Sequence, residues 1–393
     1  MGVFTGLGRA DSVARVIYTR EFLTIAGPVP PDHPSYIRRD SDDQLLQGLR
    51  DQRFCYVLGP HACGKSSLMT QAVRALRSEG HLAAVVDLAQ TGIGDKRSQA
   101  GRWYYSIAYR IVRDLRLKVD LQSWWQSKSG LMGEQRLTEF FLEIVLANTS
   151  GLVTIVFDQI EEIIGLPFTH EFFLAICNSY KGRATEPDYA RLNFVVLGVA
   201  LPQQLCKDRS FSPFDEGLSI EAEDFSLQAT YQLAVGLEGP LDQNYALFKS
   251  IYAWASGHPY LTQKIARAVL RQSGILEDVD QVISGQFLTA TAVYEEPLLS
   301  QVQRLLKRRS PYTRQVLVLL GKIGEGAEIL SDPDTMSQQV LRLSGLITVS
   351  PQGQLRFRNK LFQQIFTSRW AKVALPFEWR AFFTTLAERL SIR

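Results

Sequence analysis

Residues 59–66 read GPHACGKS and match the phosphate-binding pattern G-x-x-x-x-G-K-[ST]. Gly59 and Gly64 permit backbone angles that a Cβ would forbid, so successive N–H groups can turn toward a phosphate. Lys65 would neutralise the β- and γ-phosphates, and the Ser66 hydroxyl would serve as a Mg²⁺ ligand. These residue types at this spacing predict a site for ATP or ADP with Mg²⁺. An ordinary glycine-rich turn is the alternative.

A second group of polar residues follows the apolar run at residues 152–157. An apolar run that ends in an acidic residue, here Asp158, is the Walker B pattern, in which the carboxylate holds Mg²⁺ or its water. Gln159 stands where a glutamate would normally polarise the attacking water, and an amide cannot accept a proton. Glu161 could substitute, although two residues further along it need not point into the site. Gln159 and Glu161 are therefore the candidate catalytic residues.

Apolar and amphipathic stretches around the loop indicate how it is positioned. Residues 54–58 predict a buried strand that leads into it, and residues 66–79 predict a helix whose positive end points at the same anion. Further strands are expected at residues 82–88, 152–157 and 192–199, with a fifth at 218–220. Strands that alternate with long helices predict an α/β fold with a mostly parallel sheet covered on both faces.

The place of the fourth strand in the sheet bears on the class of ATPase. If it lies between the strand of the phosphate loop and the strand before Asp158, the chain has the additional-strand arrangement, in which the tip of that strand senses the γ-phosphate. At this tip, residues 200–203, only Gln203 is polar.

Two aromatic regions flank the predicted site. The proline-rich residues 28–34 precede Tyr36 and Ile37, and in many phosphate-loop ATPases the segment before the first strand lies over the base. Tyr36 and Ile37 are candidate base contacts, with a plain packing role as the alternative. The aromatic residues of the helical block at 102–147 have helical spacing, so we expect them in the core rather than in a base-stacking platform.

The pattern becomes wholly helical from Phe225. His258 stands at a helix start, where it could donate to a phosphate oxygen or cap a turn. Residues 311–370 predict two helices and a hairpin typical of a winged helix. From residue 301 onward there are 15 Lys and Arg against 6 Asp and Glu. This surplus could grip DNA phosphates, but we favour an intramolecular or protein contact because neither helix shows a base-reading set.

Composition sets the broad class. The chain has 393 residues, of which 46% are hydrophobic and 21% charged, as in soluble proteins of two or three domains. Its four cysteines lack C-x-x-C spacing, and two of them lie in or beside the phosphate loop, which indicates a reducing compartment. The sequence has no apolar run of membrane-spanning length and no signal peptide pattern. We therefore expect a cytoplasmic protein without a membrane partner.

Several segments together carry a family resemblance over residues 22–372. They are residues 34–40, 54–58, 64–69, 257–263, 342–346 and 355–359. They resemble the bacterial AAA-like ATPase domain that is abundant in cyanobacteria and often precedes WD-type repeats or other sensor modules. The chain is also similar to STAND signalling ATPases and archaeal origin-recognition ATPases. The resemblance implies that residues 257–259 are a Gly-x-Pro lid motif with His258 as a nucleotide contact, and that Ser67 belongs to the nucleotide-binding set.

Two departures from the family pattern affect hydrolysis. The family usually has Asp-Glu where this chain has Asp158-Gln159, and a polar residue is usual where Leu201 stands. We therefore expect an intact nucleotide site with slow ATP hydrolysis.

The sequence thus predicts an arm at 1–34, an ATPase core at 35–224, a helical lid at 225–300, a winged helix at 301–372 and an amphipathic helix at 373–393. The leading hypothesis is a molecular switch that couples nucleotide state to homo-oligomerisation or to a protein partner carrying a sensor or effector. The alternative is a DNA-binding ATPase of the origin-recognition or transposition-regulator kind.

Overall fold

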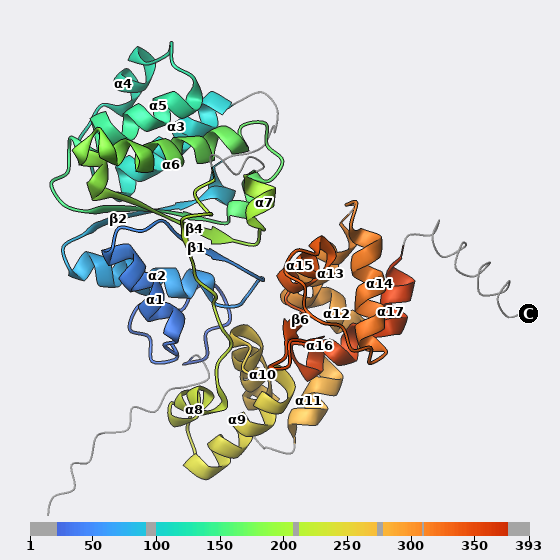
Figure 1. Ribbon diagram of the computed structural model, residues 1–393. Helices are drawn as coiled ribbons and strands as arrows, with labels where there is room; N and C mark the ends of the chain where they lie inside the picture. The colour runs from blue at the N-terminus through green and yellow to red at the C-terminus, as the bar shows by residue number, and fades with distance from the viewer. Residues whose placement is uncertain (1–21, 92–99, 207–211, 273–277, 309, 376–393) are drawn as a thin grey trace, which may run out of the picture.

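The computed structural model describes residues 22–91, 100–206, 212–272, 278–308 and 310–375 (Figure 1). Its largest part, the α/β core, is built on a five-stranded sheet. The strands are β1 (Cys55–Leu58), β2 (Leu82–Asp87), β3 (Val153–Asp158), β4 (Leu192–Gly198) and β5 (Leu218–Ser219). All are parallel, in the order β2-β3-β4-β1-β5. The predicted parallel sheet is confirmed, and β4 does lie between the strand of the phosphate loop and the strand that ends at Asp158.

Helices cover both faces of the sheet, because strands with apolar residues on both sides need two packing partners. On one face lie α1 (Asp40–Arg50) and α2 (Lys65–Ser78), and on the other lie α3 (Ala100–Asp114), α5 (Gly133–Phe140) and α6 (Thr169–Lys181), as Figure 1 shows. The shorter pieces are α4 (Leu121–Ser127), a π-helical turn (Phe141–Leu146), α7 (Pro202–Leu205) and 3-10 turns at Leu88–Gln90, Ile160–Ile163, Gly182–Ala184 and Pro187–Arg191. Trp103 and Tyr104 of α3 and Trp125 of α4 are buried in the hydrophobic cluster on this face of the sheet, so the expectation that these aromatics form core is confirmed.

A helical unit follows the core and consists of α8 (Leu227–Val235), α9 (Leu241–Ala255), α10 (Pro259–Gln272), α11 (Asp278–Gln286), α12 (Ala290–Glu295) and α13 (Pro297–Lys307). A C-terminal unit then contains α14 (Thr313–Gly324), α15 (Met336–Leu343), the antiparallel strands β6 (Ile347–Val349) and β7 (Leu355–Phe357), α16 (Lys360–Ile365) and α17 (Ser368–Ala374). The two predicted helices correspond to α14 and α15 and the predicted hairpin to β6 and β7, and two further helices, α16 and α17, follow them.

The helical unit and the C-terminal unit share one hydrophobic cluster. Leu261 and Leu299 from the first pack in the same cluster as Leu320 and Phe362 from the second. The core, in contrast, has separate clusters on the two faces of its sheet. Among the described residues, no helix combines the length and the apolar composition that crossing a bilayer requires. Residues 376–393, which hold most of the expected C-terminal amphipathic helix, and most of the N-terminal arm lie outside the described residues.

Candidate nucleotide-binding site

The phosphate loop runs from the end of β1 into α2. Gly64 caps α2 with φ of 88°, a left-handed conformation that favours glycine, and an added Cβ would come within 3.1 Å of Arg39 Nη2. At the other end of the loop, the Gly59 N–H donates to Gly198 O at 3.0 Å and ties the loop to β4. The N-terminus of α2 therefore faces the inside of the loop, where an anion is favoured by the unpaired N–H groups.

Lys65 is buried and turns back over the loop. Its Nζ donates to Gly59 O at 2.9 Å and to Pro60 O at 2.5 Å. The ammonium group is thus held at the side of the loop formed by Gly59 and Pro60. That this charge meets the β- and γ-phosphates of a bound nucleotide stays a prediction from the sequence.

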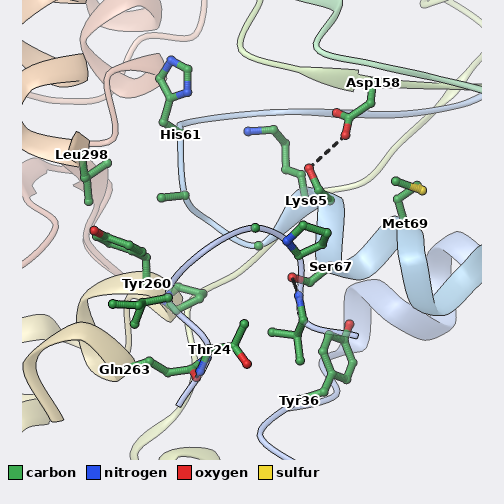
Figure 2. Close-up of a pocket in the computed structure, with 18 of the residues that line it drawn as sticks. Thr24, Tyr36, His61, Lys65, Ser67, Met69, Asp158, Tyr260, Gln263 and Leu298 are labelled. Carbon is green, nitrogen blue, oxygen red and sulfur yellow. Dashed lines mark hydrogen bonds between the residues drawn. The ribbon is translucent and has the colours of Figure 1, made fainter. Parts of the chain in front are cut away.

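Ser66 and Asp158 are brought together although they are far apart in the sequence. Ser66 Oγ donates to Asp158 Oδ2 at 3.0 Å, the bond dashed in Figure 2. Burial raises the pKa of Asp158, while its bonds from the Gln159 N–H and Ser66 act in the opposite direction. A hydroxyl beside a carboxylate offers the hard oxygen ligands that Mg²⁺ prefers. The described residues contain no cluster of three or more metal-binding side chains. Mg²⁺ usually takes few protein ligands and completes its shell with phosphate oxygens and water.

A cavity of about 660 Å³ opens beside the loop and is lined by the loop, the ends of β2 and β3, and the helical unit (Figure 2). Tyr36 and Ile37, the candidate base contacts, both line it. The Tyr36 hydroxyl donates to Asp42, and burial together with this bond raises the pKa of Tyr36. The cavity volume lies within the range of small-molecule and cofactor sites.

The chain just before Tyr36 forms a further wall that the sequence did not predict. The Thr24 N–H donates to Gln263 Oε1 at 2.8 Å, and the Val29 N–H donates to Ser67 Oγ at 2.9 Å. Residues 24–29 therefore connect the helical unit with α2 across the cavity. Ser67, a predicted nucleotide contact, uses its hydroxyl to hold this segment.

Gln159 lies at the carboxyl edge of the sheet in a left-handed conformation, with φ of 60°. Its N–H donates to Asp158 Oδ1 at 2.9 Å, and its side-chain Nε2 donates to Asp87 Oδ1 at 2.9 Å. Asp87 ends β2 directly beside Asp158 and lines the same cavity. The sequence analysis missed Asp87, although an apolar strand ending in aspartate is the same signal that identified Asp158.

Glu161 also lines the cavity, on the 3-10 turn after β3. Its Oε2 accepts the Val199 N–H at 2.8 Å and so caps the end of β4. The Glu161 carboxylate therefore lies at the edge of the cavity, but one of its oxygens is hydrogen-bonded to the backbone of Val199. Leu201 lies outside the residues that line this cavity, and Gln203 is exposed.

His258 is not brought to the cavity with the other predicted residues. It is 1% exposed and packs edge-on against Phe362 of α16, with ring centroids 5.9 Å apart. Burial, with the nearby Arg358 charge, lowers the pKa of His258 to about 3. Pro259 and Tyr260 line the cavity instead. In this conformation the structure therefore places His258 at the junction with the C-terminal unit rather than on a phosphate.

The C-terminal unit touches the phosphate loop from the other side. Arg358 forms a two-pronged ion pair with Asp224, with Nε and Nη2 at 2.6 and 2.7 Å from the carboxylate oxygens. Gly345 lies so close to Pro60 that an added Cβ would be 2.8 Å from the proline Cβ. Arg358, one of the basic residues considered for DNA, is thus paired within the chain, whereas Arg356 is exposed.

Arg39 links this contact to the loop itself. Its Nη1 donates to Cys63 O at 2.9 Å and to Glu223 O at 3.0 Å. Glu223 directly precedes Asp224, which pairs with Arg358. Hydrogen bonds and one peptide linkage therefore connect the phosphate loop to the C-terminal unit through Arg39.

Comparison with known proteins agrees with this architecture. A family model described as an AAA-like domain matches residues 24–368. An uncharacterised WD repeat-containing protein of Synechocystis sp. is 32% identical over 372 residues, which cover 89% of this chain and 30% of that protein. The Walker-type ATPase PABY2304 of Pyrococcus abyssi matches with a TM-score of 0.61 and 13% identity, over 88% of this chain and 99% of that one. The ORC2 protein of Aeropyrum pernix, solved in ADPNP-ADP complexes, matches with a TM-score of 0.53 and 13% identity, over 91% and 99% of the two chains.

Proposed function

The chain belongs to the AAA-like domain family, and from this membership we propose that it is an ATP-binding molecular switch of the STAND or AAA-like type. In this proposal the nucleotide state controls the conformation and, through it, oligomerisation or signalling to a partner. The working parts are an ATPase core at 35–224, a helical lid at 225–300 and a winged helix at 301–372. A reducing, cytoplasmic location is part of the proposal, since all four cysteines are buried and none of them forms a disulfide.

The observation that carries the proposal is the contact between the phosphate loop and the C-terminal unit. Gly345 packs on Pro60 of the loop, and the Arg358–Asp224 pair lies at the same junction. If a bound nucleotide changes the conformation of the phosphate loop, it therefore also changes the packing between Pro60 and Gly345. Switching further requires that ATP and ADP bind the docked and the released arrangement with different affinity, because a ligand indifferent to the two states shifts nothing.

ATP and ADP with Mg²⁺ are the nucleotides and metal that the site residues fit best. The structural likeness to an archaeal protein solved with ADPNP and ADP supports the nucleotide. When bound, Mg²⁺ would be held by Ser66 and by Asp158, directly or through water, and would neutralise phosphate charge. Gln159 can orient a water but cannot deprotonate it, so we propose slow hydrolysis and a long-lived ATP state.

The partner is proposed to be a second copy of this chain or a protein that carries a sensor or effector. The WD repeat relative supports the second option, because repeat arrays present binding surfaces to other proteins. The chain spans only 30% of that relative, so the output of the switch is a matter for experiment.

Mass photometry in ADP, in ATP and in a non-hydrolysable ATP analogue tests the switch. We expect a change in mass or in protease sensitivity that the analogue preserves and ADP does not. Lys65→Ala is the matched control, because it should abolish nucleotide binding and with it the response. Identical mass and digestion in all three nucleotides would remove the proposal, and tight ATP binding by Lys65→Ala would remove the phosphate-loop assignment.

A DNA-binding ATPase that uses the basic winged helix remains the second candidate, favoured by the exposed Arg342 and Arg356. A salt series of DNA binding decides between the two. A steep loss of affinity with salt, made shallower by Arg356→Ala, would support DNA recognition.

A further inference from the structure

A second cavity, of about 540 Å³, lies at the junction between the α/β core and the C-terminal unit. Residues 200–202 after β4 and residues 219–224 at the end of β5 form its core wall, and α15 and β6 form the facing wall. Figure 1 shows α15 and β6 on the side of the C-terminal unit that is nearest the core. The volume is in the range of small-molecule sites, which often occur where two domains meet.

The phosphate loop separates this junction cavity from the nucleotide cavity. Gly59, Pro60 and Cys63 line the junction cavity, whereas Gly64 lines the nucleotide cavity. Lys65 lines both, and its Nζ donates to the carbonyl oxygens of Gly59 and Pro60. A molecule in the junction cavity would therefore touch the loop without taking the place of the nucleotide.

The two walls of the junction cavity carry opposite charges. The core wall has Glu221, Glu223 and Asp224, and the C-terminal wall has Arg342 and Arg358. Asp224 and Arg358 already pair across the junction. Within the part of the chain that the structure describes, Glu221, Glu223 and Arg342 form no ion pair. Unpaired negative charge thus remains on one wall and unpaired positive charge on the other.

This division of charge selects the kind of ligand that fits. An anion would be repelled by Glu221 and Glu223, and a cation would be repelled by Arg342. A zwitterion avoids both costs, because its ammonium group can lie toward the carboxylates and its carboxylate toward the guanidinium. Arginine suits this task, since its planar guanidinium can give two parallel hydrogen bonds to a carboxylate. Glu223 is held in place on the core wall, because its Oε1 accepts the Ser41 N–H at 3.0 Å.

We propose that the junction cavity binds a zwitterionic amino compound, a free amino acid or a short peptide, between the two glutamates and Arg342. Because this ligand contacts both walls, it binds the docked arrangement of the C-terminal unit more tightly than a released one and so stabilises docking. The binding follows from the cavity alone, and only its effect on switching rests on the proposed function.

Isothermal titration calorimetry of the full chain with single L-amino acids and with dipeptides tests the site. We expect saturable binding of at least one of these compounds, with one site per chain. Its C-terminal amide and its N-acetyl derivative each lack one of the two charges and should bind about tenfold more weakly or worse. The comparison of amino acids with dipeptides identifies which of the two sources supplies the ligand.

Variants of the two walls locate the binding. Glu221→Gln and Arg342→Gln should each weaken it about tenfold or more, the loss typical of one hydrogen bond to a charged group. Arg356→Ala removes an exposed arginine of the same unit that does not line the cavity, and it should bind as wild type. Because Glu221 and Arg342 are exposed, their variants should melt at the wild-type temperature without ligand, which separates a folding defect from a binding defect.

Three results overturn the inference: no saturable binding of any amino acid or dipeptide, equal binding of the amide and N-acetyl derivatives, or unchanged binding in both wall variants. The proposed function fails separately. A chain that binds the zwitterion but has the same mass and digestion in all nucleotides would keep this site and lose the switch. A chain that responds to nucleotide but binds no zwitterion would keep the switch and lose this site.

Discussion

Gln159 and Asp87 come from different strands, and the Gln159 side-chain Nε2 donates to Asp87 Oδ1 at 2.9 Å. A carboxylate can only accept, so the amide nitrogen must face Asp87 and the amide oxygen must face away from it. Asp87 thereby fixes the orientation of a side chain that can hold a water but cannot take its proton. This pair is the structural reason for proposing that the site keeps the geometry of an ATPase and hydrolyses ATP slowly.

Replacing Gln159 by glutamate should raise the rate of ATP hydrolysis by about tenfold or more, because it restores a general base. The new carboxylate would lie against Asp87, and repulsion between the two should raise its pKa. Since only the deprotonated form acts as a base, the gain should grow as the pH rises through that pKa. A pH–rate profile of Gln159→Glu measures this, and nucleotide affinity should change little.

The double variant Asp87→Asn with Gln159→Glu is the matched control. It exchanges the two functional groups, so the hydrogen bond is kept and the repulsion is removed. Its rate gain should therefore extend to lower pH than that of the single variant. If the two profiles coincide, Asp87 does not influence position 159.

Variants of Glu161 can show whether this residue has a structural role or a catalytic one. Glu161→Ala should lower the free energy of unfolding by about 1–3 kcal/mol, because the buried Val199 N–H loses its acceptor. Glu161→Gln keeps an acceptor oxygen and should recover most of that stability. Chemical denaturation checks both values. Should the wild type hydrolyse ATP at ordinary rates, and should Glu161→Gln abolish this activity, Glu161 would be the catalytic carboxylate and the slow switch would be wrong.

Arg358→Ala should release the C-terminal unit from the core. The Arg358 and Asp224 side chains are 10% and 23% exposed, so removing the arginine leaves a largely buried carboxylate without its partner, and we expect a cost of roughly 2 kcal/mol. Hydrogen exchange should then become faster around Asp224 and across β6 and β7. Arg356→Ala, two residues earlier and on β7, is the control, since its side chain is exposed, and it should leave exchange unchanged.

Ser66→Ala should selectively weaken the Mg²⁺-dependent part of ATP binding. The variant loses the hydroxyl that bonds Asp158 and keeps Lys65, so affinity without Mg²⁺ should be retained. A loss of roughly tenfold in apparent Mg²⁺ affinity is expected. Titrations with and without EDTA test this, and equal Mg²⁺ dependence in both proteins would exclude Ser66 as a ligand.

His258 predicts an acid-sensitive junction between the helical and C-terminal units. Its pKa of about 3 in the folded state lies below the ordinary value, so folding favours the neutral imidazole. The resulting stability is fully present above about pH 6.5 and is lost as the pH falls toward 3, by about 2 kcal/mol at pH 5. His258→Asn should flatten the slope of stability against pH in this range, whatever its effect on absolute stability. An unchanged slope would show that another group controls the acid response.

The parts of the fold that the sequence predicted are those with local signals. The loop is recognised from eight consecutive residues, and each buried strand from its own apolar run. The Ser66–Asp158 contact could also be anticipated, because two carboxyl ends of parallel strands meet at one edge of a sheet. Local sequence patterns could not show the direction in which each side chain points. His258 does stand directly before α10, as expected, but its ring packs against Phe362 of the C-terminal unit.

Contacts between residues far apart in the sequence could not be predicted either. Nothing near Arg358 in the sequence indicates Asp224, which lies 134 residues away. The chain before Tyr36 shows only turn residues and prolines, so its place over α2 depends on contacts that exist only after folding. Asp87 is different, because its signal was present and was missed.

The cluster shared by the helical and C-terminal units limits how the molecule can be divided. Because α13 supplies Leu299, Val302 and Leu306 to that cluster, a chain ending near residue 300 would expose an apolar face that normally packs on α14 and α16. We therefore expect the two units to melt together, as one cooperative body distinct from the sheet. The same argument applies to gene fusion and to the exchange of segments between proteins. Such an event would transfer the helical and C-terminal units together, and the boundary between them and the α/β core would fall close to Asp224.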